Sequence, residues 1–416
     1  MKKLVILLLS ALMVLGGLVG CSKENTPADG GESTPAETSK KIGIILVGDE
    51  NEGYTYAHML GIKDAAKGLG IADEDILWKY TVGEDQTCED AAIDLIENGA
   101  TLVISNSYGH QSFMQKVAQE YPDVTFVADT GDTAANSGLK NFKNAFTAVY
   151  ESRYVSGVVA GLKLQELIDN GAIVDANLDE NGNIKIGYVG AYPYAEVVSG
   201  YTAFYLGIKS VVSNVVMFVE YTNSWFDITA EGTVADDLMS RGCVIIGQHA
   251  DSTGAPTKVQ SNMQNNTYGF TAYSVGYNVS MLDVAPDVAL TSASNVWEKF
   301  YTYAFTCWQN GTDMVTDWVG GYNEGAVEIT ELGKAVAAGT QEAVDKTIAA
   351  IKSGELHVFD ASTFTIGGET PTSILGDLDG DFTPEYECLI DGYFHESEFR
   401  SAPYFAARID GITELN

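Results

Sequence analysis

Positive charge is scarce in this sequence. Its 416 residues include 23 Lys and Arg against 57 Asp and Glu, so the formal net charge is −34 at pH 7. A chain this acidic repels the phosphate backbone of nucleic acids, and no basic patch offsets the charge. We therefore expect no nucleic-acid partner, and we interpret the acidic residues as a solvated exterior.

Metal-ligating and nucleophilic residues are also few. The chain has five Cys and five His, and Cys88, Cys243, Cys307 and Cys388 show no C-x-x-C spacing. We interpret these four as mostly buried thiols and leave one disulfide open. The sequence has no G-x-S-x-G motif and no phosphate-binding glycine loop, so we predict no catalytic residues, no metal and no cofactor.

The apolar run at the start of the chain is too short for a convincing membrane span. It covers residues 4–20, follows Lys2 and Lys3, and ends in glycine, which is typical of a signal-peptide core. The stretch "LVGC" resembles a bacterial lipobox, in which Cys21 becomes the lipidated first residue. We predict a signal peptide at 1–20; an ordinary secretory signal is the alternative.

The next segment, residues 21–40, has almost no large apolar side chains and is rich in Ser, Thr, Pro, Gly and Glu. Such a segment cannot bury enough surface to fold, so we predict a flexible tether. A lipid on Cys21 would then hold the folded body at the outer face of the cytoplasmic membrane.

From Lys41 onward, apolar runs alternate with helical patterns, and the alternation restarts after the turn signal "ENGN". Strands are predicted at 41–47, 75–82, 101–107 and 124–130, and again at 184–191, 215–223, 243–251, 268–275 and 288–294. Helices are predicted at 55–69, 86–98 and 110–120, and again at 196–212, 229–241 and 255–265. Alternation of this kind predicts right-handed β-α-β units and parallel sheets. The fold class is therefore α/β, with two doubly wound parallel-sheet lobes.

The remainder of the chain does not simply extend the second lobe. An aromatic helix pattern at 295–311 and another helix at 342–356 indicate that the chain returns to the first lobe and then comes back. The crossing segments would act as a hinge. The predicted boundaries are 41–131 plus 295–318 for lobe 1, and 132–294 plus 319–416 for lobe 2.

Aromatic and polar residues follow the carboxyl ends of the predicted strands, where open α/β sheets bind ligands. The predicted ligand-binding residues are Tyr54, Tyr56, Asn106, Ser107, Tyr192, Asn223, Trp225 and Asp251. The residues expected behind them are His58, Asp129, Glu196, His249 and Ser274. Rings combined with amides and carboxylates suit a flat ligand with polar edges, held between the rings.

Several alternatives stay open. Asn223 and Asp251 each precede a helical pattern and are candidate helix caps. A zinc receptor would use His58, His110 and His249, and a nucleoside-processing enzyme would use His249 with Asp251. The stretch "DLDGDFTPEYEC" (377–388) has acids at the first, third, fifth and ninth positions of a calcium loop but Phe and Cys at the sixth and twelfth. We interpret it as a solvated acidic turn.

Six stretches together resemble the basic membrane protein family. They are "YESRYVSGVVAGL" (150–162), "GYVGAYPYAEVVSGYTAFYLG" (187–207), "EYTNSWFD" (220–227), "IGQHADS" (246–252), "ALTSAS" (289–294) and "WVGGYNEGAVEI" (318–329). Members of this family are solute-binding lipoproteins of ABC importers, typified by purine nucleoside receptors. The resemblance implies a type I periplasmic-binding-protein fold that closes on a purine base or nucleoside, works as a monomer and serves an ABC permease in the membrane.

The resemblance also has departures. Nucleoside-binding members carry an acidic stretch after the first strand, where this chain has "DENEGYTYAHM", and an acid for the ribose where this chain has Ser274. The first loop is similar instead to a branch of which some members bind a free purine base. The resemblance therefore favours the base over the nucleoside.

Anchoring is testable on the full-length chain. Cys21→Ser removes the sulfur that would carry the lipid, so the variant should leave the membrane fraction while its circular dichroism spectrum and thermal unfolding stay unchanged. Persistence of the variant in membranes after a high-salt wash would contradict the lipoprotein prediction.

Overall fold

The structure, a computed structural model, describes residues 40–416. The predicted signal peptide, the tether up to residue 39 and Cys21 lie outside the described residues. Among the helices that the structure describes, none is both long enough and apolar enough to cross a membrane.

The first sheet is entirely parallel and has the strand order β11-β5-β4-β3-β1-β2. Its strands are β1 (Lys41–Ile45), β2 (Ile76–Lys79), β3 (Ala100–Ser105), β4 (Thr125–Asp129), β5 (Phe142–Thr147) and β11 (Asp317–Gly320). Its helices are α1 (Gly53–Leu69), α2 (Gln86–Glu97), α3 (Gln111–Glu120) and α8 (Glu298–Asn310), with short turns η1 (Asp73–Asp75) and η2 (Tyr108–His110).

The alternation of side chains along β1 explains how the helices cover both faces of this sheet. Ile42 and Ile44 pack into the cluster that includes α1 and α8, whereas Ile45 packs into the cluster that includes α2 and α3. Successive side chains of a strand point to opposite faces, so a strand buried on both faces is apolar throughout. This is why the runs at 41–47 and 101–107 are nearly continuous.

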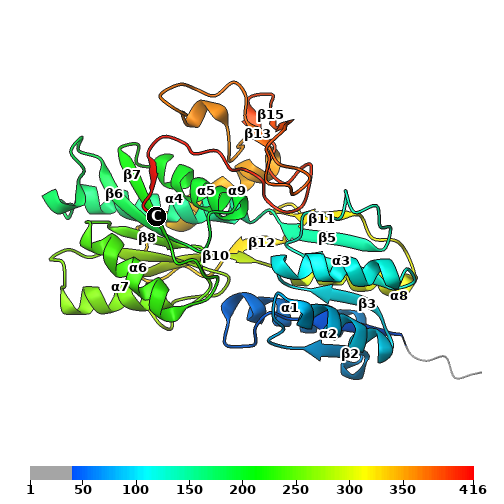
Figure 1. Cartoon of the computed structure of the whole chain (residues 1–416). Helices are drawn as coiled ribbons and strands as arrows, with labels where there is room; N and C mark the ends of the chain where they lie inside the picture. Colours follow the sequence, from blue (N-terminus) through cyan, green and yellow to red (C-terminus); the bar gives the residue numbers. More distant parts are fainter. Residues whose placement is uncertain (1–39) are drawn as a thin grey trace, which may run out of the picture. The chain divides into compact units, whose positions relative to one another are not determined.

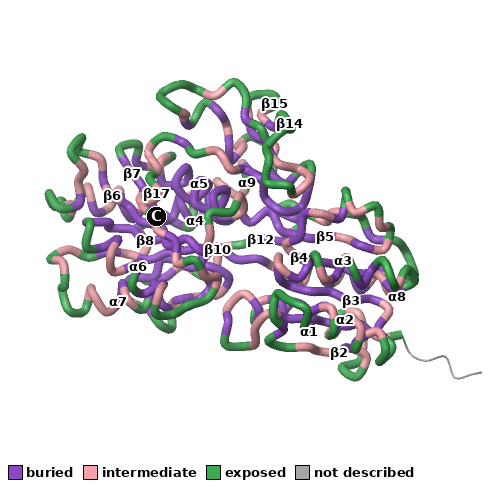
Figure 2. Tube along the Cα trace, in the orientation of Figure 1, coloured by how far each residue is buried: buried purple, intermediate pink, exposed green. Residues whose placement is uncertain are grey.

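The second sheet repeats the arrangement, with the order β12-β10-β9-β8-β6-β7-β17 and β12 as its antiparallel strand. Its strands are β6 (Ile184–Gly190), β7 (Val215–Tyr221), β8 (Ile245–Gln248), β9 (Tyr273–Tyr277), β10 (Ala289–Asn295), β12 (Val327–Ile329) and β17 (Ile412–Glu414). Its helices are α4 (Val149–Asp169), α5 (Ala195–Lys209), α6 (Ile228–Ser240), α7 (Gly254–Asn265) and α9 (Thr340–Ser353), with η3 (Asp175–Asn177) before β6. Figure 2 shows the buried central strands of both sheets.

Helices α4 and α5, both of the second lobe, pack against each other so closely that their backbones are in contact. A Cβ on Gly207 would lie 2.1 Å from the carbonyl oxygen of Tyr154, and one on Gly157 would lie 2.2 Å from that of Phe204. Only glycine allows this approach, so both residues are required by packing and not by flexibility.

The chain passes between the lobes after β5, after β10 and between β11 and β12. The last crossing joins the yellow strands β11 and β12 of Figure 1. The hydroxyl of Thr147 donates a hydrogen bond to Oδ1 of Asn295, which joins the first two crossings. We predicted that this part of lobe 1 ends at residue 131, whereas the first sheet continues to residue 147 through strand β5. Strand β5 was not predicted, because its only buried apolar residues are Phe142, Ala145 and Phe146.

The C-terminal segment, residues 361–416, contacts both lobes. It contains η4 (Ala361–Thr363) and the short strands β13 (Leu375–Gly376), β14 (Tyr386–Glu387), β15 (Leu389–Ile390) and β16 (Tyr393–Phe394), drawn in orange and red in Figure 1. Strand β17 pairs with β7 of the second sheet, while Ser401 donates from its amide and Oγ to Asp317 of the first sheet at 3.2 and 2.9 Å. The segment thus bridges the lobes.

The four cysteines of the described chain, Cys88, Cys243, Cys307 and Cys388, are buried and unpaired within residues 40–416. The prediction of buried thiols is confirmed. Burial raises the pKa of Cys88 to about 12 and that of Cys388 to about 11, so neither thiol ionises near neutral pH.

Candidate functional site

A cavity of about 640 Å³ lies where the carboxyl ends of the two sheets face each other. Loops that follow β1, β3, β6, β7 and β8 all contribute to its lining. Strands β1 and β3 flank the reversal of strand order in one sheet, and β6 and β8 flank it in the other. The volume falls within the roughly 300–1,000 Å³ of pockets that hold small organic ligands.

Three aromatic rings of the second lobe form one wall of the cavity. Tyr192 and Tyr194 stack with centroids 5.3 Å apart, and the ring of Trp225 meets Tyr192 edge-on at 5.2 Å. The backbone fixes Trp225, because its carbonyl oxygen accepts a hydrogen bond from the amide of Asp251 at 2.8 Å. The wall is therefore an extended aromatic surface on a fixed loop.

The facing wall in the first lobe contains Tyr54, at the start of α1. Its hydroxyl donates to the carbonyl oxygen of Asn106 at 2.5 Å, and its ring meets His58 edge-on at 4.5 Å. His58 in turn stacks on Trp297 at 3.9 Å. The side-chain oxygen of Asn106 accepts from the amide of Val47 at 2.8 Å, which ties the loops after β1 and β3 together.

A buried chain of polar groups lies under the second-lobe wall. Arg153 donates from Nη1 to the hydroxyl of Tyr188 and to the carbonyl of Gln248, and its guanidinium lies 3.9 Å from the ring centroid of Tyr277. Tyr188 contacts Nδ1 of His249 at 3.4 Å, and Nε2 of His249 lies 2.7 Å from Glu196. The chain holds His249 and Glu196 at the edge of the cavity.

Burial lowers the pKa of His249, so we treat the ring as neutral at pH 7 and as the donor to Glu196. Burial alone would raise the pKa of Glu196, but the imidazole beside it and the charge of Arg153 hold this pKa below its ordinary value. The cavity therefore has a negative group that is already paired, which suits holding a ligand more than proton transfer.

Asp251 is a buried acid in the lining of this cavity. It is 6% exposed, and its Oδ1 accepts a hydrogen bond from Asn278 at 2.6 Å. Burial, followed by the nearby acids Glu52, Glu231 and Glu196, raises the pKa of Asp251 well above its usual range. A raised pKa favours the protonated carboxyl, which can offer a donor as well as an acceptor to a ligand edge.

Six of the eight residues predicted to bind ligand line this one cavity: Tyr54, Asn106, Ser107, Tyr192, Trp225 and Asp251. Tyr56 lies outside the lining and is 40% exposed, because residues two apart on a helix point to different faces. Asn223 also lies outside, at a turn where its φ is +55°.

Neither Asn223 nor Asp251 caps a helix. Asp227 caps α6 by accepting from the amides of Thr229 and Ala230, and Thr253 precedes α7. The capping alternative is wrong for both residues.

The five residues predicted to stand behind the ligand lie in three different places. Glu196 and His249 line the cavity directly. His58 and Asp129 lie deeper, where both contact the hydroxyl of Tyr301, at 2.7 and 3.1 Å. Burial lowers the pKa of His58 and raises that of Asp129, which disfavours the charged form of each, although Nδ1 of His58 lies 3.5 Å from Oδ2 of Asp129. Ser274 is buried near the start of β9, because this strand ends at Tyr277 and not at the predicted residue 275.

Sequence reasoning missed several lining residues. Phe146 is the second-last residue of β5, a strand that was not predicted, and Tyr277 is the last residue of β9, whose end was predicted too early. Asp132 follows β4 and was assigned to the other lobe. The C-terminal segment also contributes, through Arg400 and Tyr404 among others. No strand-end pattern marks that segment, so its part in the cavity could not be predicted from the sequence.

The histidines of the zinc alternative do not meet. His110 lies at the start of α3, where Nε2 contacts the carbonyl oxygen of Val82 at 3.1 Å, while His58 and His249 belong to different lobes. Within residues 40–416, metal-ligating atoms gather only at Asp377, Asp379, Asp381 and Glu385, all within 4.8 Å of one another. Phe382 in this turn adopts a φ of +67°, the conformation that glycine supplies in calcium loops. Exposed acidic groups also gather in this way without a metal, so we assign the turn no ligand.

Two lobes with an aromatic cavity between them have the architecture of the type I periplasmic-binding-protein fold. Residues 40–361 match the Bmp family, described as ABC transporter substrate-binding protein PnrA-like. The chain belongs to this family. Proteins of this class bind a small-molecule ligand outside the cytoplasm, present it to an ABC permease and are not enzymes, which excludes the nucleoside-processing alternative.

Relatives and solved structures agree with this assignment. The chain is 31% identical over 331 residues to a purine-binding protein of Brucella abortus (strain 2308), covering 79% of this chain and 85% of that protein. It is 26% identical over 340 residues to a candidate ABC transporter glucose-binding protein of Haloferax volcanii (strain DS2), covering 81% and 78%. An ABC transporter solute-binding protein of Aeropyrum pernix K1 has the same fold, with a TM-score of 0.61 at 15% identity over 80% of this chain and 94% of that one.

The raised pKa of Asp251 predicts a pH dependence of stability in the ligand-free protein. A folded-state pKa above the unfolded value of about 3.8 gives a stabilising contribution that is complete below that value and is lost as pH rises through the folded pKa. Asp251→Asn lacks this loss, so its free energy of unfolding relative to wild type should increase between pH 5 and 8, by at most about 1.4 kcal/mol per pH unit. Urea unfolding at four pH values measures it.

Asp85→Asn is the matched control for that measurement. Asp85 is an exposed cap of α2, and hydrogen bonds from Thr87 lower its pKa, so it stays ionised throughout this range. Its unfolding free energy should run parallel to that of wild type. A parallel course for Asp251→Asn as well would contradict the raised pKa.

Proposed function

We propose that this protein captures a purine base or purine nucleoside between its lobes and delivers it to an ABC permease. The observation that carries the proposal is that Tyr54 of the first lobe and Trp225 of the second line the same cavity. The 31% identity to a protein named as purine-binding supports the same ligand class.

Stacking on the aromatic side chains would supply most of the affinity for the purine ring. Base–aromatic contacts contribute roughly 1–3 kcal/mol per ring in nucleic-acid-binding proteins, and every base has a face that can stack. Tyr54, Tyr192 and Trp225 would therefore hold a purine firmly but without distinguishing one purine from another.

Selection comes from polar groups at the rim. Asn106, Ser107 and Asp251 lie in the lining, and a protonated Asp251 matches an edge that carries both a donor and an acceptor. A ligand that leaves such a buried group unpaired is penalised by about 1–3 kcal/mol, so the rim discriminates where the rings do not.

Closure couples binding to transport. Because the two aromatic walls belong to different lobes, the ligand completes the closed form and shifts the population toward it. We propose that a lipid on Cys21 anchors the protein, as a monomer, at the outer face of the cytoplasmic membrane, where a permease meets the closed form.

Removal of one wall should weaken binding measurably. Trp225→Ala is expected to raise the Kd for purines by about 10-fold or more, from the loss of roughly 1–3 kcal/mol of stacking. Isothermal titration calorimetry with adenine, guanine, hypoxanthine and their ribonucleosides provides the measurement.

Tyr54→Ala and Tyr56→Ala form a matched pair of controls on the first turn of α1. The first removes a lining ring and should weaken binding, whereas the second removes a 40%-exposed ring outside the cavity and should not. Unchanged purine affinity in Trp225→Ala, or exclusive binding of a non-aromatic solute, would refute the proposed function.

A further inference from the structure

Part of the cavity wall comes from residues beyond those that match the family. The match ends at residue 361, yet Asp377, Phe382, Arg400 and Tyr404 of the C-terminal segment all line the cavity. The segment brings a buried cation to a site that otherwise consists of aromatic rings, amides and acids.

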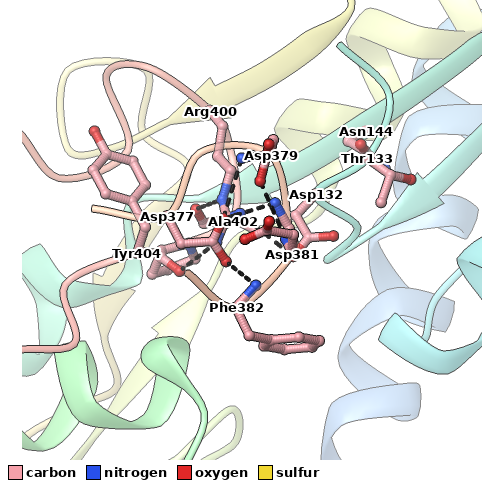
Figure 3. Close-up of polar contacts among 12 residues, drawn as sticks. Asp132, Thr133, Asn144, Asp377, Asp379, Asp381, Phe382, Arg400, Ala402 and Tyr404 are labelled. Atoms are coloured by element: carbon pink, nitrogen blue, oxygen red, sulfur yellow. Dashed lines mark hydrogen bonds and ion pairs between the residues drawn. The ribbon is translucent and has the colours of Figure 1, made fainter. Parts of the chain in front are cut away.

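Arg400 faces Asp132 across this end of the cavity (Figure 3). Its side chain is 6% exposed, and Nη1 lies 3.5 Å from Oδ2 of Asp132 and 4.0 Å from Oδ1 of Asp377. Nε donates to the carbonyl oxygen of Ala402 at 3.2 Å, which fixes the guanidinium. Nη1 makes no hydrogen bond with residues 40–416, although it is buried at the cavity.

Asp132 is also held in place. Its Oδ1 accepts from Nε2 of Gln111 at 3.0 Å, and its Oδ2 accepts from the hydroxyl of Tyr108 at 3.2 Å. A Cβ on Gly380 would lie 3.0 Å from Oδ1, so the acidic turn packs directly on this carboxylate. The result is a fixed acceptor beside a fixed donor that is ion-paired but makes no hydrogen bond within residues 40–416.

The charges around this pair restrict what it can bind. One guanidinium stands against Asp132 and Asp377, and Asp379, Asp381 and Glu385 lie in the same turn as Asp377. This excess of negative charge opposes a phosphate or carboxylate. A hydroxyl group can accept from Arg400 and donate to Asp132 at the same time.

We infer that Arg400 and Asp132 form a second subsite that receives a neutral, hydroxylated substituent of the ligand. The inference rests on the proposed function, because the aromatic walls would hold the ring to which this substituent is attached. It assigns ligand recognition to a segment outside the family match and makes Arg400 a specificity-determining residue. It also reverses the preference for a free base that the first loop indicated.

Calorimetry with four forms of one purine tests the subsite. The probes are adenine, adenosine, 2′,3′-dideoxyadenosine and AMP, with the guanine series run in parallel. Wild type should bind the ribonucleoside at least about 10-fold more tightly than the free base or the dideoxynucleoside, because neither of these two carries the 2′- and 3′-hydroxyls that would satisfy the buried donor. The monophosphate should bind more weakly than the ribonucleoside.

Variants then separate recognition from structure. Arg400→Met and Asp132→Asn should each weaken ribonucleoside binding about 10-fold or more while changing the affinity for the free base less than about twofold. Arg408→Met is the matched control, since Arg408 lies in the same segment, is 45% exposed and contacts Glu414 instead of the cavity. It should behave as wild type with every probe.

The outcomes distinguish the two claims. Equal wild-type affinity for base, ribonucleoside and dideoxynucleoside would overturn the subsite and leave the purine proposal standing. An equal loss for base and ribonucleoside in Arg400→Met would make Arg400 merely structural, and tightest binding of the monophosphate would make the subsite an anion site; both overturn the inference. Failure of every probe to bind wild type would refute the proposed function, and the inference with it.

Discussion

The site depends on one constraint, namely that parallel strands bring all their carboxyl ends to the same edge of a sheet. Each lobe has a reversal of strand order, between β1 and β3 and between β6 and β8, and the loops on either side diverge there. Because the two edges face each other, short loops suffice to bring Tyr54 and Trp225 to the same cavity. The buried pairs behind them, such as Arg153 with Tyr188, hold these loops in position.

Much of this arrangement was predictable from the sequence, because strands buried on both faces leave nearly continuous apolar runs. The helices and most strands follow the predicted alternation, and six of the eight predicted contacts share one cavity. The errors have local causes. The predicted strand ended two residues before the true end of β9, so Ser274 was chosen as a site residue instead of Tyr277. Tyr54 and Tyr56 were both predicted to bind ligand, although they lie on different faces of one helix. Arg400 could not be predicted, because no periodic pattern in the sequence shows that the segment after the last long helix returns to the cavity.

That returning segment changes how the hinge must work. Three crossings of the chain already join the lobes, and the C-terminal segment adds a noncovalent bridge, with β17 in the second sheet and Ser401 and Arg400 on Asp317 and Asp132 of the first. The β17 ladder is a backbone pairing, whereas the contacts with the first lobe are side-chain hydrogen bonds and an ion pair. Opening of the cavity on that side would therefore separate the segment from the first lobe, and a ligand held by both Asp132 and Arg400 would oppose the separation.

The central claim is that the cavity holds an aromatic ring system between the two lobes. Mass spectrometry of the small molecule released when the natively purified protein is denatured tests it most directly, since the ligand is then chosen by the protein from everything in the cell. We predict that the released molecule is a purine, carried as its ribonucleoside. Release of a sugar or another solute without an aromatic ring, in stoichiometric amount, would contradict it.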